Sequence, residues 1–321
     1  DKDIITIEIE HVNTDALREL ERMGKTVHPA PAALDIIKDK GTQKEFYRQN
    51  NIPTAPFELF EDEKALLQAV SEGRWKLPFV QKTRTAGYDG KGVALMRTPA
   101  DLEKKLLSGP CLTEELADIQ TEIAVIAAQN EDGSVAVFPA VEMDFHPEAN
   151  LVEFLLCPAR ISPLQEAEAQ ALAERVIRSL GCCGLLAVEM FLTKSGEIWV
   201  NESAPRPHNS GHHTIDSAIT SQFQQHIRAV TNLPLGSGTQ VTGAAVMLNL
   251  LGEEGHKGPV VYPGAEECLA MEGVYIHLYG KAMTSPFRKM GHVTITAADA
   301  ESAIRKADFV KKQLKVVSTE V

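Results

Sequence analysis

Two stretches of the sequence hold side chains that could bind a metal ion and small anions. The first runs from Asn201 to His212 and contains a carboxylate, an arginine, two histidines and two asparagines, with two prolines and a glycine that favour an irregular path. It follows the largely apolar segment 197–200, so its polar groups emerge where a strand ends. A hydrophobic core cannot hold so many donors and acceptors without partners. We therefore expect a ligand site here.

The second stretch supplies a carboxylate to the same place. Glu189 lies within the apolar segment 185–192, which predicts a buried strand, and a turn at 193–196 should fold the chain back so that Glu189 approaches Glu202. Two carboxylates in an apolar setting repel each other, and a divalent cation removes that repulsion. Mg²⁺ commonly takes one or two carboxylates and completes its shell with phosphate oxygens and water. The alternative for each acid alone is an ordinary ion pair or a surface cap.

A glycine-rich, basic loop joins two short apolar segments between residues 79 and 95. Its sequence, Gly87-Tyr88-Asp89-Gly90-Lys91-Gly92, is neither a Walker A loop nor the dinucleotide-binding fingerprint. Glycines let backbone N–H groups approach an anion, and Lys82 could present a positive charge to phosphates. The alternative is an ordinary hairpin with an Asp-Gly turn.

A third segment places acids at the end of a predicted strand. Glu114 and Glu115 follow the segment 111–113, and Glu122 precedes the apolar run 123–128. These acids could bind sugar hydroxyls or an exocyclic amine, or simply face solvent.

Local patterns predict further elements. Isoleucines at 5, 7 and 9 predict a strand on which Glu8 and Glu10 point the same way. Thr42 and Glu45 predict a capping box for a helix over 43–48, and Thr-Pro at 98–99 and Ser-Pro at 162–163 predict two more helix starts. Residues 214–230 predict one helix, with apolar side chains at 215, 219, 223 and 227 on one face.

Taken in this order, the segments resemble the ATP-grasp superfamily, and within it the 5-(carboxyamino)imidazole ribonucleotide synthetases of purine biosynthesis. The resemblance covers nearly the whole chain, is most specific in 205–212, and extends to the tail motif at 280–281 and 288–292. A departure is Ala86, where the family usually has a second glycine. The resemblance implies an α/β (α+β) ATP-grasp fold with a remnant of an N-terminal Rossmann-like (pre-ATP-grasp) domain and a small β-rich C-terminal domain.

The resemblance also sets expected domain boundaries. We expect the end of the pre-ATP-grasp domain at 1–30, the nucleotide-binding domain at 31–235 and a substrate-contacting domain at 236–321. The family opens with a glycine-rich strand-turn-helix, whereas this sequence begins with Asp1 at a strand that resembles a late one of that domain. We therefore expect the start of the domain, and with it part of the substrate pocket, to be missing.

The implied activity is an ATP-dependent C–N ligase reaction. It carboxylates aminoimidazole ribonucleotide with bicarbonate, by way of carboxyphosphate, in de novo purine biosynthesis. ATP and Mg²⁺ are the implied cofactors, and a cytoplasmic homodimer is the expected state.

The resemblance assigns residues to each ligand. Those expected to act in catalysis are Arg206 and His208, as bicarbonate anchors, and Tyr88. Those expected to bind ATP are Lys40, Lys82, Gly87, Tyr88, Asp89, Gly90, Lys91, Gly92, Glu114 (near the adenine), Glu115, Leu116, Glu122 (at the ribose), His146, Asn201 and Glu202. Those expected to bind the substrate are Glu8, Asn209, Lys281, Arg288 and Lys289, and those expected to bind the metal are Glu189 and Glu202. Surface ion pairs are the alternative for each substrate-binding residue.

The composition of the chain limits the classes of molecule that it is expected to bind. The chain has 321 residues, 44% of them hydrophobic, and a net charge of −12, which disfavours nucleic acid and anionic membranes as partners. Its five cysteines lack metal-binding spacing, which suits a reducing cytoplasm, and no apolar run approaches the length of a membrane span.

Two other functions stay open. A formate-dependent glycinamide ribonucleotide transformylase shares most nucleotide motifs, although Tyr88-Asp89 and the run 208–212 favour the carboxylating enzyme. A truncated chain could also bind nucleotide without turnover.

Overall fold

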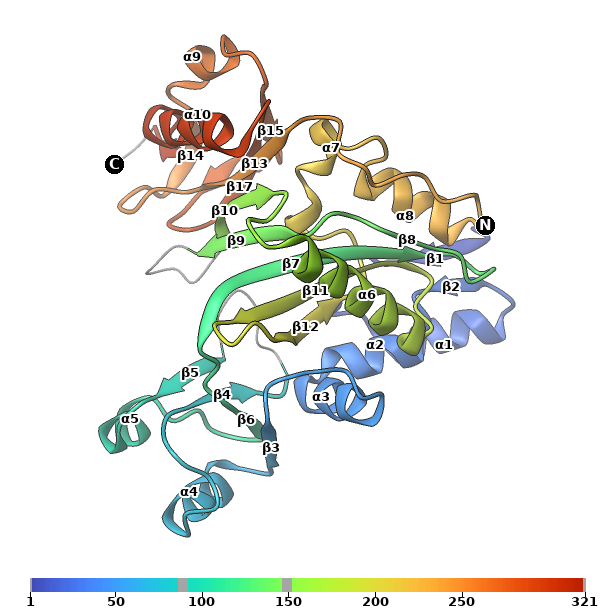
Figure 1. Ribbon diagram of the computed structural model, residues 1–321, viewed down its shortest axis with the longest axis vertical. Helices are drawn as coiled ribbons and strands as arrows, with labels where there is room; N and C mark the ends of the chain where they lie inside the picture. Colours follow the sequence, from blue (N-terminus) through green and yellow to red (C-terminus); the bar gives the residue numbers. More distant parts are fainter. Residues whose placement is uncertain (1, 86–91, 146–151, 320–321) are drawn as a thin grey trace.

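The structure is a computed structural model that describes residues 2–85, 92–145 and 152–319. Within these ranges the strands form sheets of nine, four, three and two strands. The largest sheet crosses the middle of the molecule, with the four-stranded sheet at one end and the C-terminal elements at the other (Figure 1).

The nine-stranded sheet is antiparallel throughout. Its order is β12 (Ile198–Ala204), β11 (Gly184–Thr193), β7 (Ile119–Gln129), β9 (Val141–Phe145), β10 (Val152–Cys157), β13 (Ala244–Leu251), β17 (Lys289–Ala297) and β15 (Val274–Leu278), with β8 (Val135–Val137) paired to β7. Helix α6 (Pro163–Leu180) packs against β7 and β11, where Val125, Ala127 and Val188 join its apolar side in one core. As predicted, α6 begins at Ser162, which forms a capping box, and it ends at Gly181, whose φ of 58° suits glycine.

The four-stranded sheet carries the predicted hairpin. Its order is β3 (Phe57–Phe60), β6 (Cys111–Glu115), β4 (Phe79–Thr83) and β5 (Val93–Met96), and Lys82 lies opposite Val93. Helices α4 (Glu63–Ser71) and α5 (Pro99–Lys104) cover it, and their side chains share a core with Phe79 and Met96. The loop residues 86–91 lie outside the described part of the chain.

The predicted N-terminal strand is shorter than its isoleucine pattern suggests. Strand β1 (Ile4–Thr6) pairs in parallel with β2 (Thr26–His28), and α1 (Thr14–Arg22) and α2 (Pro31–Lys38) pack beside them. The prediction of a strand through residue 9 is wrong. Thr6 is paired with His28, and the next residue along β2 is Pro29, which has no N–H to extend the ladder.

Two helix predictions also need correction. Helix α3 (Lys40–Gln49) begins earlier than predicted, because Asp39 caps it by accepting a hydrogen bond from the backbone N–H of Thr42 at 2.9 Å. The single helix predicted over 214–230 is two helices, α7 (Thr214–Ser217) and α8 (Gln222–Val230), because Ser221 and Gln224 form a new capping box.

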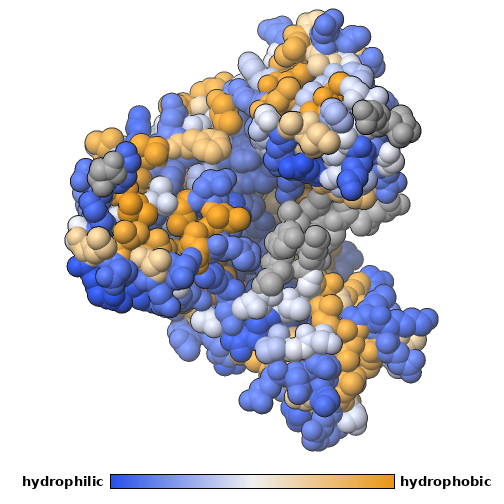
Figure 2. All heavy atoms as spheres, turned by 180° about the vertical axis from the view of Figure 1, so that it is seen from behind, coloured by the Kyte–Doolittle hydropathy of each residue, from blue (hydrophilic) through white to orange (hydrophobic). Residues whose placement is uncertain are grey.

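The apolar side chains at 215, 219, 223 and 227 of the segment 214–230 face outward. Ile219 is 60% exposed and Ile227 56%, and Phe223 is also exposed. Seen from behind, hydrophobic side chains gather on this side of the molecule (Figure 2). The 3.6-residue pattern therefore marks a surface here, while α8 packs through Ala229 and Val230.

The C-terminal elements enclose a second core. Helix α10 (Ala300–Gln313) packs on β13 and β17, and α9 (Ala265–Leu269) lies beside β15. A small sheet joins β16 (Met283–Thr284), β14 (Gly258–Val261) and β18 (Val317–Ser318). Among the described residues, no helix is both long and apolar enough to cross a membrane.

Candidate active site

A cavity of about 1010 Å³ lies where the four-stranded sheet, the central sheet and the N-terminal part meet. From behind, the molecule is hollowed between its parts, with hydrophilic side chains along the hollow (Figure 2). Thirteen of the predicted site residues line the cavity: Lys40, Lys82, Glu114, Glu115, Leu116, Glu122, Glu189, Asn201, Glu202, Arg206, His208, Asn209 and Lys289. Segments more than 240 residues apart in the sequence therefore contribute to one space.

Other predicted site residues are not brought to this cavity. Glu8, Gly92, Lys281 and Arg288 do not line it. The predicted residues Gly87, Tyr88, Asp89, Gly90, Lys91 and His146 lie outside the described residues. Lys281 donates to the backbone oxygen of Lys289 at 2.6 Å, and the exposed Arg288 donates to that of Met283 at 2.7 Å. Both cations therefore donate to backbone oxygens of the segment that runs from β16 to the start of β17.

Glu189 and Glu202 are direct partners across β11 and β12. Burial, then the charges of Glu202 and Glu122, raise the pKa of Glu189 to about 8. Burial acts in the same direction on Glu202, but its ion pair with Lys40 outweighs this and lowers the pKa of Glu202. Near pH 7 one acid is thus ionised beside a lysine, whereas the other is mostly protonated.

The two acids suit a magnesium ion whose coordination shell is completed by oxygens of a bound ligand. No group of three or more His, Cys, Asp or Glu side chains suited to a metal occurs in the described ranges. Two carboxylates on neighbouring strands, beside Asn201, suit Mg²⁺ that takes its remaining oxygens from phosphates and water. Burial and then repulsion from Glu202 and Glu122 raise the pKa of Glu189, and a divalent cation would relieve that repulsion.

Lys82 projects from the end of β4 into the cavity. Its Nζ lies 2.8 Å from Glu114 Oε2 and donates to Asn201 Oδ1 at 2.8 Å. Glu114 stands on the neighbouring strand β6, two residues beyond the cross-strand partner of Lys82, so both side chains share one face of the sheet. Lys82 is therefore positioned by two strands of different sheets.

Arg206 and His208 lie on the irregular run after β12. Arg206 is paired with Glu10 at 2.8 Å, and His208 Nε2 lies 3.5 Å from Glu189 Oε1. Burial, then the charges of Arg206 and Lys289, lower the pKa of His208 to about 3, so its ring is neutral near pH 7. It can then donate one hydrogen bond and accept another.

Buried packing explains the shape of this run. Gln222 accepts from the backbone N–H of His208 and donates to its oxygen, each at 2.8 Å. At Gly211 a Cβ atom would lie 2.2 Å from Ile126 Cδ1 and 2.6 Å from Gln222 Oε1, so a larger residue would have to displace these side chains. The run is held against β7 rather than free in solvent.

An amide pair joins the same run to the C-terminal elements. Asn209 Nδ2 donates to Asn249 Oδ1 at 2.8 Å, and Asn249 Nδ2 donates back to Asn209 Oδ1 at 2.9 Å. Asn249, which stands on β13, also donates to the backbone oxygen of Val152 at 2.6 Å. The side chain of Asn209 is thus held by a strand of the C-terminal part.

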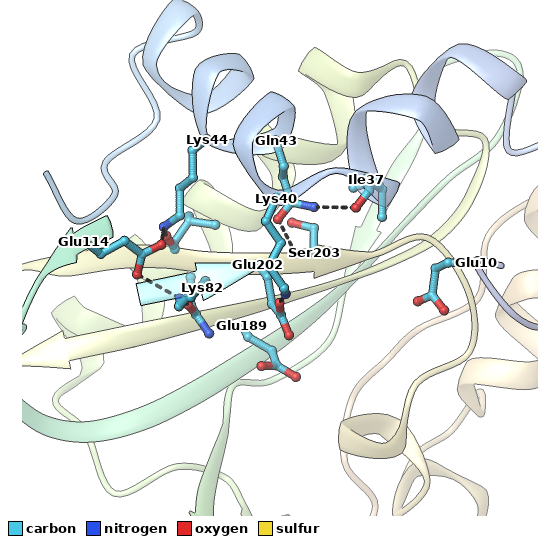
Figure 3. Close-up of polar contacts among 12 residues, drawn as sticks. Glu10, Ile37, Lys40, Gln43, Lys44, Lys82, Glu114, Glu189, Glu202 and Ser203 are labelled. Atoms are coloured by element: carbon cyan, nitrogen blue, oxygen red, sulfur yellow. Dashed lines mark hydrogen bonds and ion pairs between the residues drawn. The ribbon is translucent and has the colours of Figure 1, made fainter. Parts of the chain in front are cut away.

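Sequence reasoning missed several residues of the site. Glu10 lines the cavity where Glu8 was predicted, and Gln43 and Lys44 connect α3 to β12. Figure 3 shows Lys44 and Lys82 both directed at Glu114, and Lys40 at Glu202. A signal existed: positions 40, 43, 44 and 47 have the spacing of a buried helix face, yet they carry polar side chains.

Comparison with known proteins identifies the family. Residues 45–223 match the ATP-grasp domain family, and residues 245–306 match the phosphoribosylaminoimidazole carboxylase C-terminal domain. The crystal structure of N5-carboxyaminoimidazole ribonucleotide synthetase from Thermotoga maritima is 44% identical, with a TM-score of 0.88 over 98% of this chain and 82% of that one. The chain belongs to the N5-carboxyaminoimidazole ribonucleotide synthetase family of ATP-grasp proteins. The family resemblance and the predicted ATP-grasp fold class are confirmed.

Two other relatives provide information on bound ligands and on chain length. A synthase from Aspergillus clavatus, solved with ADP and 5-aminoimidazole ribonucleotide, is 32% identical, with a TM-score of 0.85 over 97% of this chain and 82% of that one. Phosphoribosylaminoimidazole carboxylase from Ogataea methanolica is 36% identical over 96% of this chain, which spans only 57% of that protein's length. The chain thus spans little more than half of the curated carboxylases that it matches first.

Proposed function

We propose that this chain carboxylates aminoimidazole ribonucleotide with bicarbonate and ATP. The observation that carries the proposal is the convergence of Lys82, Glu189, Glu202, Arg206 and His208 on one cavity. A space of about 1010 Å³ is large enough for a nucleotide and a second small ligand. A family member that was solved with ADP and 5-aminoimidazole ribonucleotide supports the choice of both ligands.

The reaction divides into two substitutions. An oxygen of bicarbonate attacks the γ-phosphorus of ATP, the bond to the β-phosphate oxygen breaks, and ADP leaves. The exocyclic amine of the substrate then attacks the carbon of the resulting carboxyphosphate, and phosphate departs with the amine proton. Because phosphoryl transfer depends mainly on positioning and charge neutralisation, the protein needs well-placed cations more than a nucleophile of its own.

We assign the nucleotide to the half of the cavity formed by the four-stranded sheet and β7. The adenine lies along the segment Glu114–Leu116, the ribose at Glu122, and the phosphates at Lys82 and Lys40. Burial, opposed by Lys82, raises the pKa of Glu122 to about 7. The loop 87–92 and His146 are proposed to complete this half.

Glu189 and Glu202 would hold Mg²⁺, with Asn201 beside them. When bound, the ion would reduce the negative charge on the transferred phosphoryl group. Lys40 would then no longer be the main partner of Glu202, which frees its ammonium group for phosphate oxygens. Arg206 and the neutral His208 would anchor bicarbonate, while Asn209 and Lys289 would face aminoimidazole ribonucleotide, with Glu8, Lys281, Arg288 and Tyr88 as the remaining predicted contacts.

The decisive experiment measures phosphate release with ATP and bicarbonate, with and without aminoimidazole ribonucleotide, and the transfer of labelled bicarbonate into product. We expect one phosphate for each carboxylated product. Activity with formate and glycinamide ribonucleotide would instead identify a transformylase. Nucleotide binding without phosphate release in any mixture would identify a non-catalytic chain.

We further propose that the protein is a cytoplasmic homodimer with domains 1–30, 31–235 and 236–321. The two family matches, at 45–223 and 245–306, lie on either side of the second boundary and support it. The five cysteines, all buried and unpaired, are consistent with a reducing compartment. Light scattering on the purified protein tests the oligomeric state.

A further inference from the structure

Lys44 belongs to a buried cluster of three charges at the back of the cavity. Its Nζ lies 2.9 Å from Glu114 Oε1, while Lys82 Nζ lies 2.8 Å from Glu114 Oε2. The side chains of Lys44 and Glu114 are each 3% exposed. Figure 3 shows Glu114 between the two lysines, with Lys44 reaching it from α3 and Lys82 from β4.

Lys44 does not line the cavity, so it cannot act by touching a ligand directly. Its ammonium group also donates to Thr54 Oγ1 at 2.5 Å and to the backbone oxygen of Val200 at 3.4 Å. Val200 lies one residue before Asn201 on β12, and Asn201 accepts a hydrogen bond from Lys82. Lys44 thus contacts both of the strands that position Lys82.

The charges of the cluster explain why a second lysine is needed. Glu114 and Lys82 alone form a neutral pair, in which a buried carboxylate largely neutralises the positive charge of Lys82. With Lys44 included, the three groups carry a net charge of +1. Burial opposes the ionisation of Glu114, but Lys44 and then Lys82 outweigh it and lower the pKa of Glu114 to about 2. The carboxylate therefore remains charged and must be balanced.

Lys44 itself keeps its proton near neutral pH. Burial lowers the pKa of Lys44 to about 8, and the charge of Glu114 opposes a larger shift. At pH 7 the ammonium form therefore predominates, and the net charge of the cluster is positive.

We propose that Lys44 is a positioning residue that neutralises and holds Glu114, so that Lys82 keeps its positive charge available for the phosphates of the nucleotide. This inference rests on the proposed assignment of ATP to the cavity. It gives the polar face of α3 a role in nucleotide binding that reaches the ligand only through Glu114 and Lys82.

The test compares the affinities for ATP and for adenosine, measured by titration calorimetry, in the wild type and in Lys44→Met. Lys44→Met leaves Lys82 paired with Glu114 at zero net charge, and we expect ATP to bind about tenfold or more weakly. Adenosine lacks the phosphates that Lys82 would meet, so its affinity should stay unchanged. A purely structural role predicts instead that both affinities fall together, because a disturbed cavity affects every part of the ligand.

Controls separate this inference from the proposed function. Arg48→Met removes a positive charge from an exposed position on the same helix and should leave affinity unchanged. Unchanged ATP affinity in Lys44→Met, or an equal loss of adenosine affinity, would overturn the role of Lys44 alone. Absence of ATP binding by the wild type would overturn the proposed function as well. If Lys44→Met does not fold, Lys44→Gln, which keeps a hydrogen-bond donor but no charge, decides: a loss of ATP affinity of about tenfold or more with adenosine affinity kept supports the proposal, and any other pattern refutes it.

Discussion

The acids of the cavity differ in charge because their nearest neighbours differ. Glu114 has a lysine at each oxygen, and Glu202 is paired with Lys40. Glu189 instead lies 3.5 Å from the ring of His208, which is neutral near pH 7. Chemically identical side chains are therefore suited to different tasks: Glu114 orients a cation, whereas Glu189 and Glu202 suit a metal ion.

Substitution of either acid that we propose as a metal ligand should abolish turnover without unfolding the protein. In Glu189→Gln or Glu202→Gln we expect Mg²⁺-dependent phosphate release to fall at least about a hundredfold, because a neutral amide binds Mg²⁺ poorly. Thermal unfolding monitors the fold, and Glu197→Gln, an exposed acid near the same turn, is the matched control. Phosphate release by the wild type that persists after chelation of Mg²⁺ would refute this assignment.

Substitutions of Arg206 and of Arg288 should have different effects on the kinetics. Arg206 lines the cavity four residues after Glu202, so Arg206→Ala should lower bicarbonate-dependent phosphate release itself. Arg288 lies outside the cavity, and if it meets a remote phosphate of the substrate, Arg288→Ala should raise KM and spare kcat. Loss of one charge-assisted contact corresponds to a change of roughly tenfold to a hundredfold. If steady-state kinetics instead showed a raised KM in Arg206→Ala and lower phosphate release in Arg288→Ala, the two roles would have to be exchanged.

Helix α3 is the element that organises the half of the cavity to which we assign the nucleotide. Its polar side chains reach β12 at three places: Lys40 meets Glu202, Gln43 accepts from the backbone N–H of Ser203 at 3.2 Å, and Lys44 donates to Val200. Tyr47 completes this face through a contact of 2.8 Å between its hydroxyl and that of Ser203. The helix therefore uses hydrogen bonds, in place of purely apolar contacts, to fix the strand that carries Glu202.

Strand β13 plays the corresponding part, through Asn249, for the half that we assign to the substrate. In Asn249→Ala the amide of Asn209 loses both reciprocal hydrogen bonds, and we expect KM for aminoimidazole ribonucleotide to rise about tenfold while the affinity for ATP is kept. Steady-state kinetics with each substrate varied in turn measures the two KM values separately. Gln68→Ala, which removes an amide from an exposed position on α4, is the control and should change neither value. An equal loss for both substrates in Asn249→Ala would indicate a general loss of structure.

The molecule as a whole is joined by the same buried charges. Glu114 stands on the four-stranded sheet, and through Lys44 it connects that sheet to α3 and to the central sheet. Breaking this cluster should therefore affect global unfolding and not only the site.

Low pH should reduce the free energy of unfolding of the wild type, because Glu114 becomes protonated. Its pKa is lowered from 4.5 to about 2 in the folded protein, so its stabilisation is complete above pH 4.5 and is lost as the pH falls from about 4.5 to about 2. At about 1.4 kcal/mol for each pKa unit, the loss is on the order of 3 kcal/mol. Urea unfolding between pH 6 and pH 3 measures the greater part of it. The Lys44→Met/Glu114→Gln variant lacks this carboxylate and should lose correspondingly less stability over the same range.

Features that depend on neighbouring residues could be predicted from the sequence. The turn at 193–196 brings Glu189 opposite Glu202, and the capping signals at Ser162 and Thr98 mark true helix starts. The hairpin of β4 and β5 was predicted for the same reason. In each case a short segment contains both partners, so spacing alone determines which side chains meet.

Contacts between distant segments were decided only by the tertiary structure. Lys44 and Glu114 are 70 positions apart and meet because α3 packs against β6. The choice of Glu10 over Glu8 followed from the early end of β1, which depends on Pro29 beyond its partner strand. Residue types and local spacing thus determined which chemistry the chain can perform. The packing of helices and sheets determined which charges balance one another, because Coulomb interactions depend on distance in space and on burial, neither of which spacing along the chain specifies.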